Sequence, residues 1–322
     1  MSVLDIFSPQ ISVVAHGLEG KVITVYGGNN LGKTKQATRM KKPLYLPFEK
    51  GLNAIAGVPF MPINSWADFK KVNKQLTKQS EKAREAYQTI IIDEVDAFAK
   101  YATRYVCNQY GVNRIKDGND GYGLWTEYET ELWEEINKLL GVGYTVVFIA
   151  HAKEDKEGKI HLKGDKRAVA PVIDNSDIVA YLHTNGVDEN GDVIKSSAYL
   201  AETEHFFARS RFDYIATKID EYTAENLEAA IVDAIKKQEE IEGIQTVTFD
   251  EQKKVYASEE LDFDKIMEEI DEIGNQLVEQ ERVEELVDVV EQHLGKGKKV
   301  SECTKHQVDV VSIILDDLKD LL

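Results

Sequence analysis

Gly27-Gly28-Asn29-Asn30-Leu31-Gly32-Lys33-Thr34 has the pattern G-x4-G-K-[ST]. It follows Lys21–Tyr26, an apolar and β-branched run typical of a buried strand, and it opens a helical pattern that extends from Lys33 to Met40. Glycines let backbone N–H groups turn toward an anion, and the start of the helix adds partial positive charge. A chance glycine-rich turn is the alternative, but the strand before and the helix after favour a phosphate-binding loop.

The residues of this loop have separate expected roles. The Lys33 ammonium is expected to reach the β- and γ-phosphates, and the Thr34 hydroxyl to bind Mg²⁺. ATP and Mg²⁺ are therefore the expected cofactors. The residues predicted to bind the nucleotide are Gly27, Gly28, Asn29, Asn30, Leu31, Gly32, Lys33, Thr34 and Lys35.

Carboxylates follow two further predicted strands. The run Thr89–Ile92 ends in Asp93 and Glu94, which places acids where ligands of open α/β sheets bind. Asp93 is expected to hold Mg²⁺ through water, unless it merely ends a strand. The base that orients the attacking water is either Glu94 or Glu49, which stands just past the strand Pro43–Phe48. The alternative for Glu49 is a solvated loop acid.

A histidine ends another buried strand. His151 follows the apolar run Thr145–Ala150. At the nucleotide edge of a parallel sheet, this side chain is placed to sense the γ-phosphate. The alternative is a structural histidine with no contact to the nucleotide.

Short apolar runs alternate with helical stretches up to about residue 235. Helical patterns at Ser65–Ala86 and Leu124–Leu140 separate the predicted strands, which indicates an α/β fold whose central sheet is mostly parallel, with helices on both faces. Ile178–His183 and Ala198–Ala201 flank an Asn190-Gly191 turn, which predicts a hairpin added to one edge of the sheet.

The C-terminal part has a different character. Residues 236–322 contain 24 acidic and 11 basic residues, whereas the first 235 are nearly balanced with 33 and 28. Apolar residues at helical spacing from 261 onward predict a small α-helical unit. We therefore expect a core at 1–235, a linker at 236–260 and an acidic helical domain at 261–322.

Several classes of protein are disfavoured. Cys107 and Cys303 are far apart, which argues against a disulfide framework or a zinc site. Asp5 lies where a signal peptide would be apolar, and runs such as Val146–Ala150 are far below the ~20 residues of a membrane span. A soluble, cytoplasmic protein with no membrane partner is expected.

Together these motifs resemble those of RecA-like ATPases, most closely the phage-encoded AAA-type or Sak-type recombination group. The resemblance spans roughly Lys21–Ala230, and only the phosphate loop and the acid-ending strand are specific for ATP use. It implies a RecA-like P-loop core. It also implies that the catalytic glutamate is the acid after the strand that follows the P-loop, which favours Glu49 over Glu94.

The resemblance assigns two more roles. His151 would couple the nucleotide to a DNA-binding loop that follows it. Arg209 and Arg211, within Ala208-Arg209-Ser210-Arg211, would reach into the ATP site of a neighbouring subunit. The alternative for these arginines is a surface salt-bridge pair.

The segment after His151 is rich in lysine. Four acids interleave with its bases, and it contains no aromatic residue, so a solvated loop of mixed charge competes with a surface that follows a DNA backbone. Gly158 and Gly164 are expected to keep it mobile. The candidate DNA-binding residues are Lys153, Lys156, Lys159, Lys163, Lys166 and Arg167.

The expected function is an ATPase that acts on single-stranded DNA in phage-type recombination or replication, by annealing or in a recombinase-like way. It would assemble with itself into a ring or filament with ATP at subunit interfaces. One alternative is a hexameric DNA helicase or helicase loader. Another is a nucleotide-switched scaffold that binds a protein partner through its acidic C-terminal helices and contacts no DNA.

Overall fold

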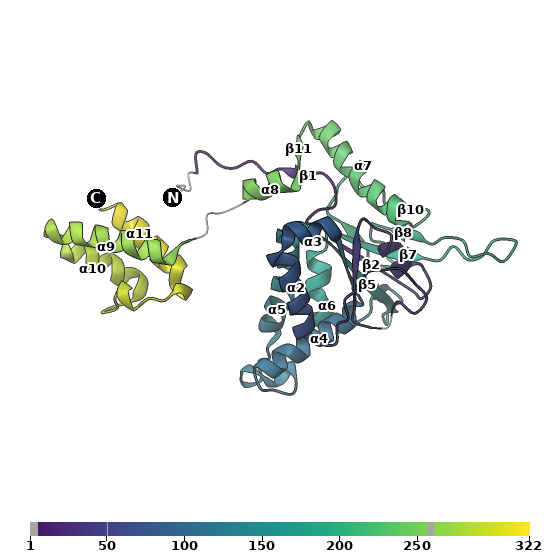
Figure 1. Cartoon of the computed structure of the whole chain (residues 1–322), viewed down its shortest axis with the longest axis horizontal. Coiled ribbons are helices and arrows are strands. Elements are labelled where there is room, and N and C mark those ends of the chain that lie inside the picture. The colour runs from purple at the N-terminus through teal and green to yellow at the C-terminus, as the bar shows by residue number, and fades with distance from the viewer. Residues whose placement is uncertain (1–5, 50, 257–260) are drawn as a thin grey trace. The chain divides into compact units, whose positions relative to one another are not determined.

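A nine-stranded sheet lies at the centre of the first part of the chain (Figure 1). The computed structural model describes residues 6–49, 51–256 and 261–322. They form two compact units, one of which spans Gln10–Tyr256. The strand order is β10-β8-β7-β2-β5-β4-β3, with β6 paired to β5 and β9 to β7. The strands are β2 (Val22–Gly27), β3 (Pro43–Pro47), β4 (Thr89–Asp93), β5 (Thr145–Glu154), β6 (Ile160–Leu162), β7 (Ile178–His183), β8 (Ser197–Tyr199), β9 (Arg209–Ser210) and β10 (Lys218–Ile219).

Five neighbouring strands, β7, β2, β5, β4 and β3, run parallel, and β8 and β10 continue the sheet antiparallel. The mixed α/β fold with a mostly parallel sheet is therefore confirmed. The register aligns the carboxyl ends: Gly27 lies opposite both His151 and Leu182, and Asp93 lies opposite Pro47 and Ile149. The residues singled out at the strand ends thus share one edge of the sheet.

Helices cover both faces because successive strand residues point in opposite directions. On β2, Val22 and Tyr26 pack with helices α2, α4, α5 and α6, whereas Ile23 and Val25 pack with α1 and α7. Five aromatic rings fill the first face near β3 and β4, with neighbouring centroids 5.0–5.8 Å apart: Phe48, Trp66, Phe69, Phe98 and Phe148. The helices of this unit are α1 (Lys33–Ala37), α2 (Trp66–Lys78), α3 (Ser80–Ala86), α4 (Val95–Gln109), η1 (Ile115–Asp117), η2 (Asn119–Gly121), α5 (Trp125–Gly141), α6 (Lys166–Asn175), α7 (Ala224–Glu242) and α8 (Phe249–Tyr256).

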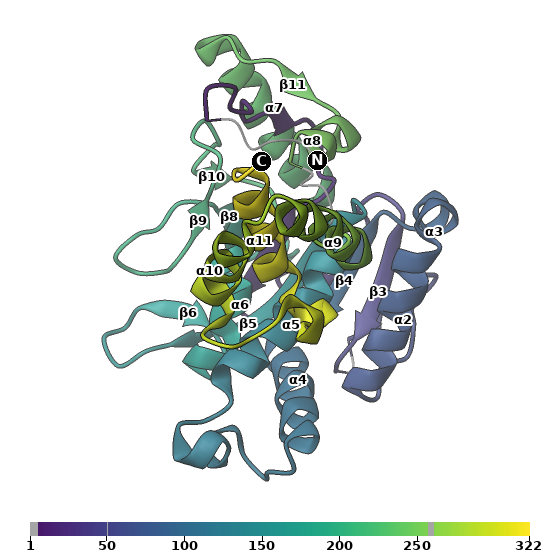
Figure 2. The same ribbon diagram turned by 90° about the vertical axis from the view of Figure 1, so that its left-hand side faces the viewer.

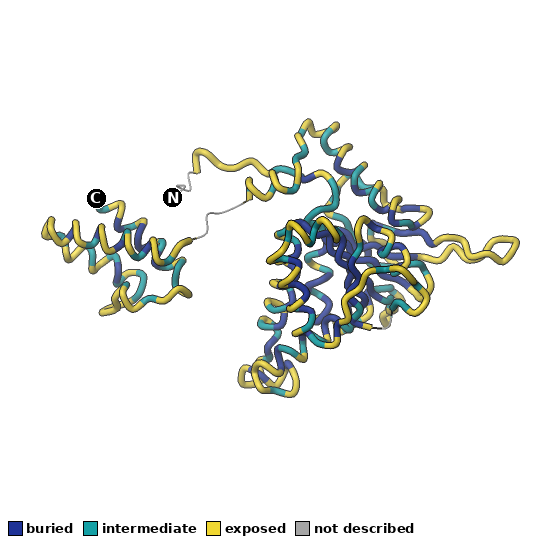
Figure 3. Tube along the Cα trace, viewed as in Figure 1, coloured by how far each residue is buried: buried dark blue, intermediate teal, exposed yellow. Residues whose placement is uncertain are grey.

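The predicted hairpin is present between β7 and β8. The Gly191 N–H donates to the Asp188 carbonyl oxygen over 3.0 Å, and Gly191 has a φ of 84°, which explains the glycine at the turn. The residues between the strands form a long arm that extends from the sheet and is almost entirely exposed (Figures 1 and 3).

The core unit extends further along the chain than expected. Residues 236–242 continue α7, and after Gly243 the strand β11 (Thr246–Val247) pairs in parallel with β1 (Val14–Ala15). The Gln252 side-chain amide in α8 also donates to the Val13 carbonyl oxygen over 2.8 Å. The polar composition of 236–260 predicted a linker, but residues 236–256 belong to the core unit. The rest of that linker, 257–260, and the first five residues lie outside the described residues.

A glycine substitution tests this docking. Gly20 has a φ of +71°, and a Cβ there would lie 2.4 Å from Cε2 of Phe249 in α8. Gly111 has a similar φ of +67° but open space around it. We expect Gly111→Ala to lower the free energy of unfolding by about 1 kcal/mol through backbone strain, and Gly20→Ala by about 1–3 kcal/mol more through the clash.

Urea unfolding of the full chain, followed by tryptophan fluorescence, measures both effects. The three tryptophans, at 66, 125 and 133, all lie in the core unit, so the signal reports on that unit alone. Equal losses for the two variants would contradict the packing of Phe249 against Gly20.

The C-terminal residues form a unit of three helices, α9 (Phe263–Glu279), α10 (Val283–Leu294) and α11 (Val308–Lys319), with short 3-10 turns η3 (Val300–Glu302) and η4 (Lys305–Gln307) before the last (Figure 1). Thr304 and Gln307 form a capping box at the start of η4. The buried residues recur at helical spacing and form one small core: Ile266, Ile270, Ile273, Leu277, Val290, Val311, Ile314, Leu315 and Leu318. Across the described residues, none of the helices has both the length and the apolar character that crossing a membrane requires.

Candidate nucleotide-binding site

The phosphate loop connects β2 to α1, as its sequence predicts. A Cβ on Gly27 would lie 2.8 Å from the Leu182 carbonyl oxygen of the adjacent strand, so only glycine fits where β2 ends. Gly32 and Asn30 have positive φ values of 84° and 61°, which turn the backbone sharply before the helix. Of the other predicted loop residues, Gly28 and Asn29 are exposed, Leu31 is partly buried, and Lys35 is exposed on α1.

The Lys33 side chain is folded onto this loop. It is only 7% exposed, and its ammonium donates hydrogen bonds to the carbonyl oxygens of Gly27, at 3.1 Å, and Gly28. Burial lowers the pKa of Lys33, while the nearby carboxylates of Asp93, Glu94 and Glu49 oppose that shift. A buried ammonium held by neutral carbonyls is well placed to exchange them for a phosphate oxygen, because an anion binds it more strongly.

Asp93 connects β4 to the phosphate loop. Its Oδ2 accepts hydrogen bonds from the Thr34 hydroxyl at 2.7 Å and from the Tyr45 hydroxyl at 2.9 Å. Burial raises the pKa of Asp93, and the two hydroxyl donors act in the opposite direction by stabilising its ionised form.

These residues fit a magnesium ion. A hydroxyl and a carboxylate supply the oxygen ligands that Mg²⁺ prefers, and Mg²⁺ in nucleotide sites takes its remaining ligands from phosphates and water. Within the described residues, no cluster of three or more His, Cys, Asp and Glu could hold a metal. Thr34 and Asp93 would therefore bind the ion together with the nucleotide.

The two candidate bases lie at the same edge but differ in environment. Oε1 of Glu49 lies 3.3 Å from Nε2 of His151, and the Glu49 side chain is 41% exposed. Glu94 is 4% exposed, and its buried Oε2 has no hydrogen-bond partner. Burial raises the pKa of Glu94, and the charge of Glu49 adds to that rise. The fold thus brings Glu49, Glu94 and His151 together beside Lys33, with only Glu49 both oriented and open to water.

Residues 19–212 match the AAA domain family, which is more than half of the chain. The chain belongs to the AAA domain family. Members of this P-loop ATPase family bind nucleotides, in agreement with the geometry of the phosphate loop. The chain is also similar to the "SPbeta prophage-derived uncharacterized protein YorG" of Bacillus subtilis (strain 168), with 74% identity over 319 residues and 99% of each chain covered.

Arg209 and Arg211 lie at the other edge of the AAA domain's sheet. Strand β9 pairs with the first residues of β7, and Arg209 donates to the Ser176 carbonyl oxygen at 3.2 Å. Arg211 donates to the Asp174 carbonyl oxygen at 3.1 Å and lies 3.6 Å from the carboxylate of Asp177. Asp177 in turn accepts from the N–H at the start of β2, roughly 17 Å of strand away from Gly27. The structure therefore does not bring these arginines to the phosphate loop of their own chain.

The lysine-rich segment of the AAA domain is an ordered hairpin rather than a glycine-hinged loop. Strand β5 continues past His151 to Glu154, and β6 pairs with it antiparallel (Figure 2). The Lys163 N–H then donates to the His151 carbonyl oxygen over 2.8 Å, which ties the end of the hairpin to the nucleotide edge. Gly158 lies in the turn of this hairpin with a φ of 86°, a left-handed conformation that favours glycine.

Its six candidate DNA-binding residues have different surroundings. Lys159 pairs with Glu202 at 2.5 Å, and the Arg167 guanidinium lies over the Trp125 ring, 4.8 Å from its centroid. The other four are exposed: Lys153, Lys156, Lys163 and Lys166.

Sequence reasoning missed Tyr45 as part of the site. It is fully buried in the middle of β3, and its hydroxyl contacts the carboxylate of Asp93. One signal was available: a tyrosine inside an apolar strand needs a hydrogen-bond partner.

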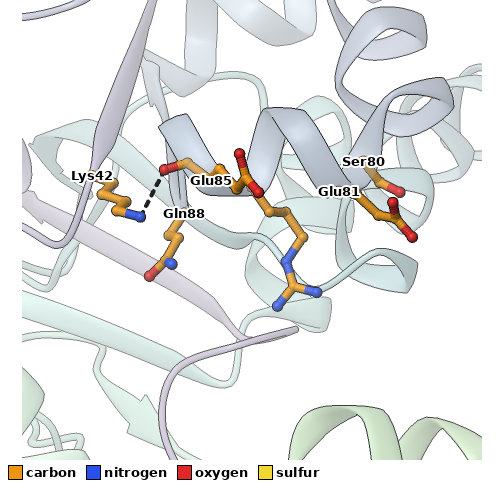
Figure 4. Close-up of a pocket in the computed structure, with 6 residues that line it drawn as sticks. Lys42, Ser80, Glu81, Glu85 and Gln88 are labelled. Carbon is orange, nitrogen blue, oxygen red and sulfur yellow. Dashed lines mark hydrogen bonds between the residues drawn. The ribbon is translucent and has the colours of Figure 1, made fainter.

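Two cavities lie elsewhere on the AAA domain. One of about 320 Å³ is near the amino ends of β3 and β4, where the Lys42 ammonium donates to the Glu85 carbonyl oxygen over 2.7 Å (Figure 4). Its lining residues include charges of both signs: Lys42, Ser80, Glu81, Arg84, Glu85 and Gln88. The other, of about 350 Å³, lies between α5 and α6. Neither contains a residue of the predicted nucleotide site.

Proposed function

We propose that this protein is a Mg²⁺-dependent ATPase of RecA-like type that acts on single-stranded DNA. The observation that carries the ATPase part is the contact between Thr34 and Asp93 at 2.7 Å, beside the buried Lys33 ammonium. It joins a phosphate-binding loop to a metal-binding carboxylate at one edge of the sheet. Mg²⁺ would neutralise charge that develops on the phosphates during hydrolysis.

Glu49 is the proposed base. Its carboxylate reaches solvent, where an attacking water enters, and His151 fixes its direction. Glu94 is the alternative, but it is only 4% exposed, so an attacking water reaches it less readily than it reaches the Glu49 side chain, which is 41% exposed. A base after β3 supports the RecA-like assignment, as does a histidine in β5, the strand between the phosphate-loop strand and the Asp93 strand.

Single-stranded DNA is the proposed effector because the lysine-bearing hairpin is physically attached to the nucleotide edge. His151 contacts Glu49 through its side chain and Lys163 through its carbonyl oxygen. A change in His151 caused by ATP would therefore reach the hairpin directly. Exposed lysines on such a hairpin can follow a phosphate backbone.

The DNA proposal predicts that single-stranded DNA stimulates ATP hydrolysis severalfold. We expect Lys153→Ala/Lys156→Ala to weaken DNA binding and to reduce its log–log salt dependence by roughly 0.7 per lost phosphate contact. Phosphate release and DNA-binding titrations at several salt concentrations measure both effects. Lys296→Ala/Lys298→Ala removes the same charge from exposed positions in the C-terminal unit and should change neither.

Other outcomes would favour the alternatives. ATPase activity that is indifferent to DNA would contradict the DNA role and favour a nucleotide-switched scaffold. The scaffold alternative has one feature in its favour. Val283 and Val287 are exposed on the acidic helix α10, where apolar side chains could contact a protein partner. Unwinding of a forked duplex would indicate a helicase instead of an annealing protein.

The proposed assembly is a ring or filament with ATP between subunits. In it, Arg209 and Arg211 would serve a neighbour's site, the role that the resemblance implies; within their own chain they bind the carbonyl oxygens of Ser176 and Asp174. The proposed setting is the cytoplasm of a phage-carrying host, in line with the prophage origin of the Bacillus subtilis relative.

A further inference from the structure

A buried tyrosine holds the carboxylate that joins the phosphate loop to the metal position. Tyr45 is 0% exposed in the middle of β3, and its hydroxyl donates to Oδ2 of Asp93 over 2.9 Å. The same oxygen accepts from the Thr34 hydroxyl, so two donors act on one atom.

Gly51 closes over this contact. A Cβ at Gly51 would lie 1.9 Å from the Tyr45 hydroxyl oxygen and 3.0 Å from Oδ2 of Asp93. The backbone there is thus packed directly against both groups, with no room for a water molecule between them. The Tyr45 hydroxyl therefore keeps its hydrogen bond to Asp93, because leaving a buried donor without a partner destabilises a protein by about 1–3 kcal/mol.

Other buried tyrosines of the described chain use their hydroxyls differently. Tyr128 donates to the carbonyl oxygen of Ala168, and Tyr144 donates to that of Leu76 at 3.1 Å. Those bonds join neighbouring elements and do not touch the nucleotide edge. Tyr45 instead contacts a carboxylate whose direction matters, because the terminal torsion of an aspartate is soft and needs a partner to fix it.

We propose that Tyr45 is a positioning residue that orients Asp93 for Mg²⁺. This inference rests on the proposed nucleotide function but concerns the affinity for the metal, not the chemical step. It predicts that the hydroxyl sets the Mg²⁺ concentration at which the protein binds nucleotide. The Tyr45 ring itself serves the core and is unaffected by removal of the oxygen.

Tyr45→Phe removes only the hydroxyl. We expect the Mg²⁺ concentration for half-maximal binding of a fluorescent ATP analogue to rise about tenfold, as for the loss of one hydrogen bond to a charged group. At saturating Mg²⁺, kcat should remain within about threefold, because the base and Lys33 are intact. Tyr144→Phe is the matched control, since it removes a buried tyrosine hydroxyl at the other edge of the sheet and should leave the Mg²⁺ dependence unchanged.

An unchanged Mg²⁺ dependence in Tyr45→Phe, or an equal rise in Tyr144→Phe, would overturn the inference. Binding without turnover in the wild type would overturn the ATPase proposal, whereas a tenfold Mg²⁺ shift in that binding would still support the role of Tyr45. Thermal unfolding without nucleotide separates a folding defect from the metal effect. If Tyr45→Phe has the melting temperature of the wild type but needs more Mg²⁺ for half-maximal nucleotide binding, the result supports a role of Tyr45 in positioning Asp93.

Discussion

Lys33→Ala is expected to reduce ATP turnover by at least about 10²–10³-fold, comparable to the loss of one preorganised donor to a transition state. Lys33 is buried at the phosphate loop, where its ammonium donates hydrogen bonds to the carbonyl oxygens of Gly27 and Gly28. Alanine leaves the loop backbone in place but removes the charge that binds the phosphates. Phosphate-release kinetics measure the loss.

Nucleotide binding gives a second readout of the same variant. A ligand that binds only the folded state raises the melting temperature, so Mg²⁺-ATP should stabilise the wild type and stabilise Lys33→Ala much less. Lys82→Ala is the control, since Lys82 is exposed on α3, away from the phosphate loop. Full turnover in Lys33→Ala would contradict the assignment of the loop as the ATP site.

The strands that carry the site could be predicted because each is a short apolar run ended by a distinctive residue. Gly27 and Asp93 are the last residues of β2 and β4, His151 lies opposite Gly27 in β5, and parallel pairing alone brings these positions to one edge. The positions of these groups therefore follow from local pattern plus the parallel topology. The hydrogen bonds between these groups do not follow from the sequence pattern, because such bonds depend on the directions of side chains on neighbouring strands.

Short strands that form only by pairing with residues distant in the sequence could not be predicted. Strand β11 has two residues and exists because it pairs with β1, more than 200 residues earlier. Phe249 packs against Gly20 and Gly143 and under the Arg84 guanidinium, and the polar residues around it gave no sign of this. The same holds for Arg209, whose two-residue strand pairs with the amino end of β7 and so places it away from the phosphate loop.

Glu49→Gln is expected to lower kcat by about 10²–10⁴-fold, the usual contribution of a general base. Binding of Mg²⁺-ATP should be nearly unchanged, because the amide keeps the size of the carboxylate and Glu49 has no role in the phosphate loop. The contact with Nε2 of His151 at 3.3 Å can persist with an amide, so the variant isolates proton acceptance from orientation. Steady-state phosphate release at saturating Mg²⁺-ATP gives kcat, and a fluorescent ATP analogue gives affinity.

Glu94→Gln is the matched comparison, since it makes the same chemical change at the same edge of the sheet. Glu94 is 4% exposed and its Oε2 has no hydrogen-bond partner among the described residues, so it is neither open to an entering water nor oriented as Glu49 is by His151. We therefore expect Glu94→Gln to retain far more activity than Glu49→Gln. The reverse order, with Glu49→Gln active and Glu94→Gln inactive, would show that the base is the acid beside Asp93. In that case the contact between Glu49 and His151 would only link β3 to β5.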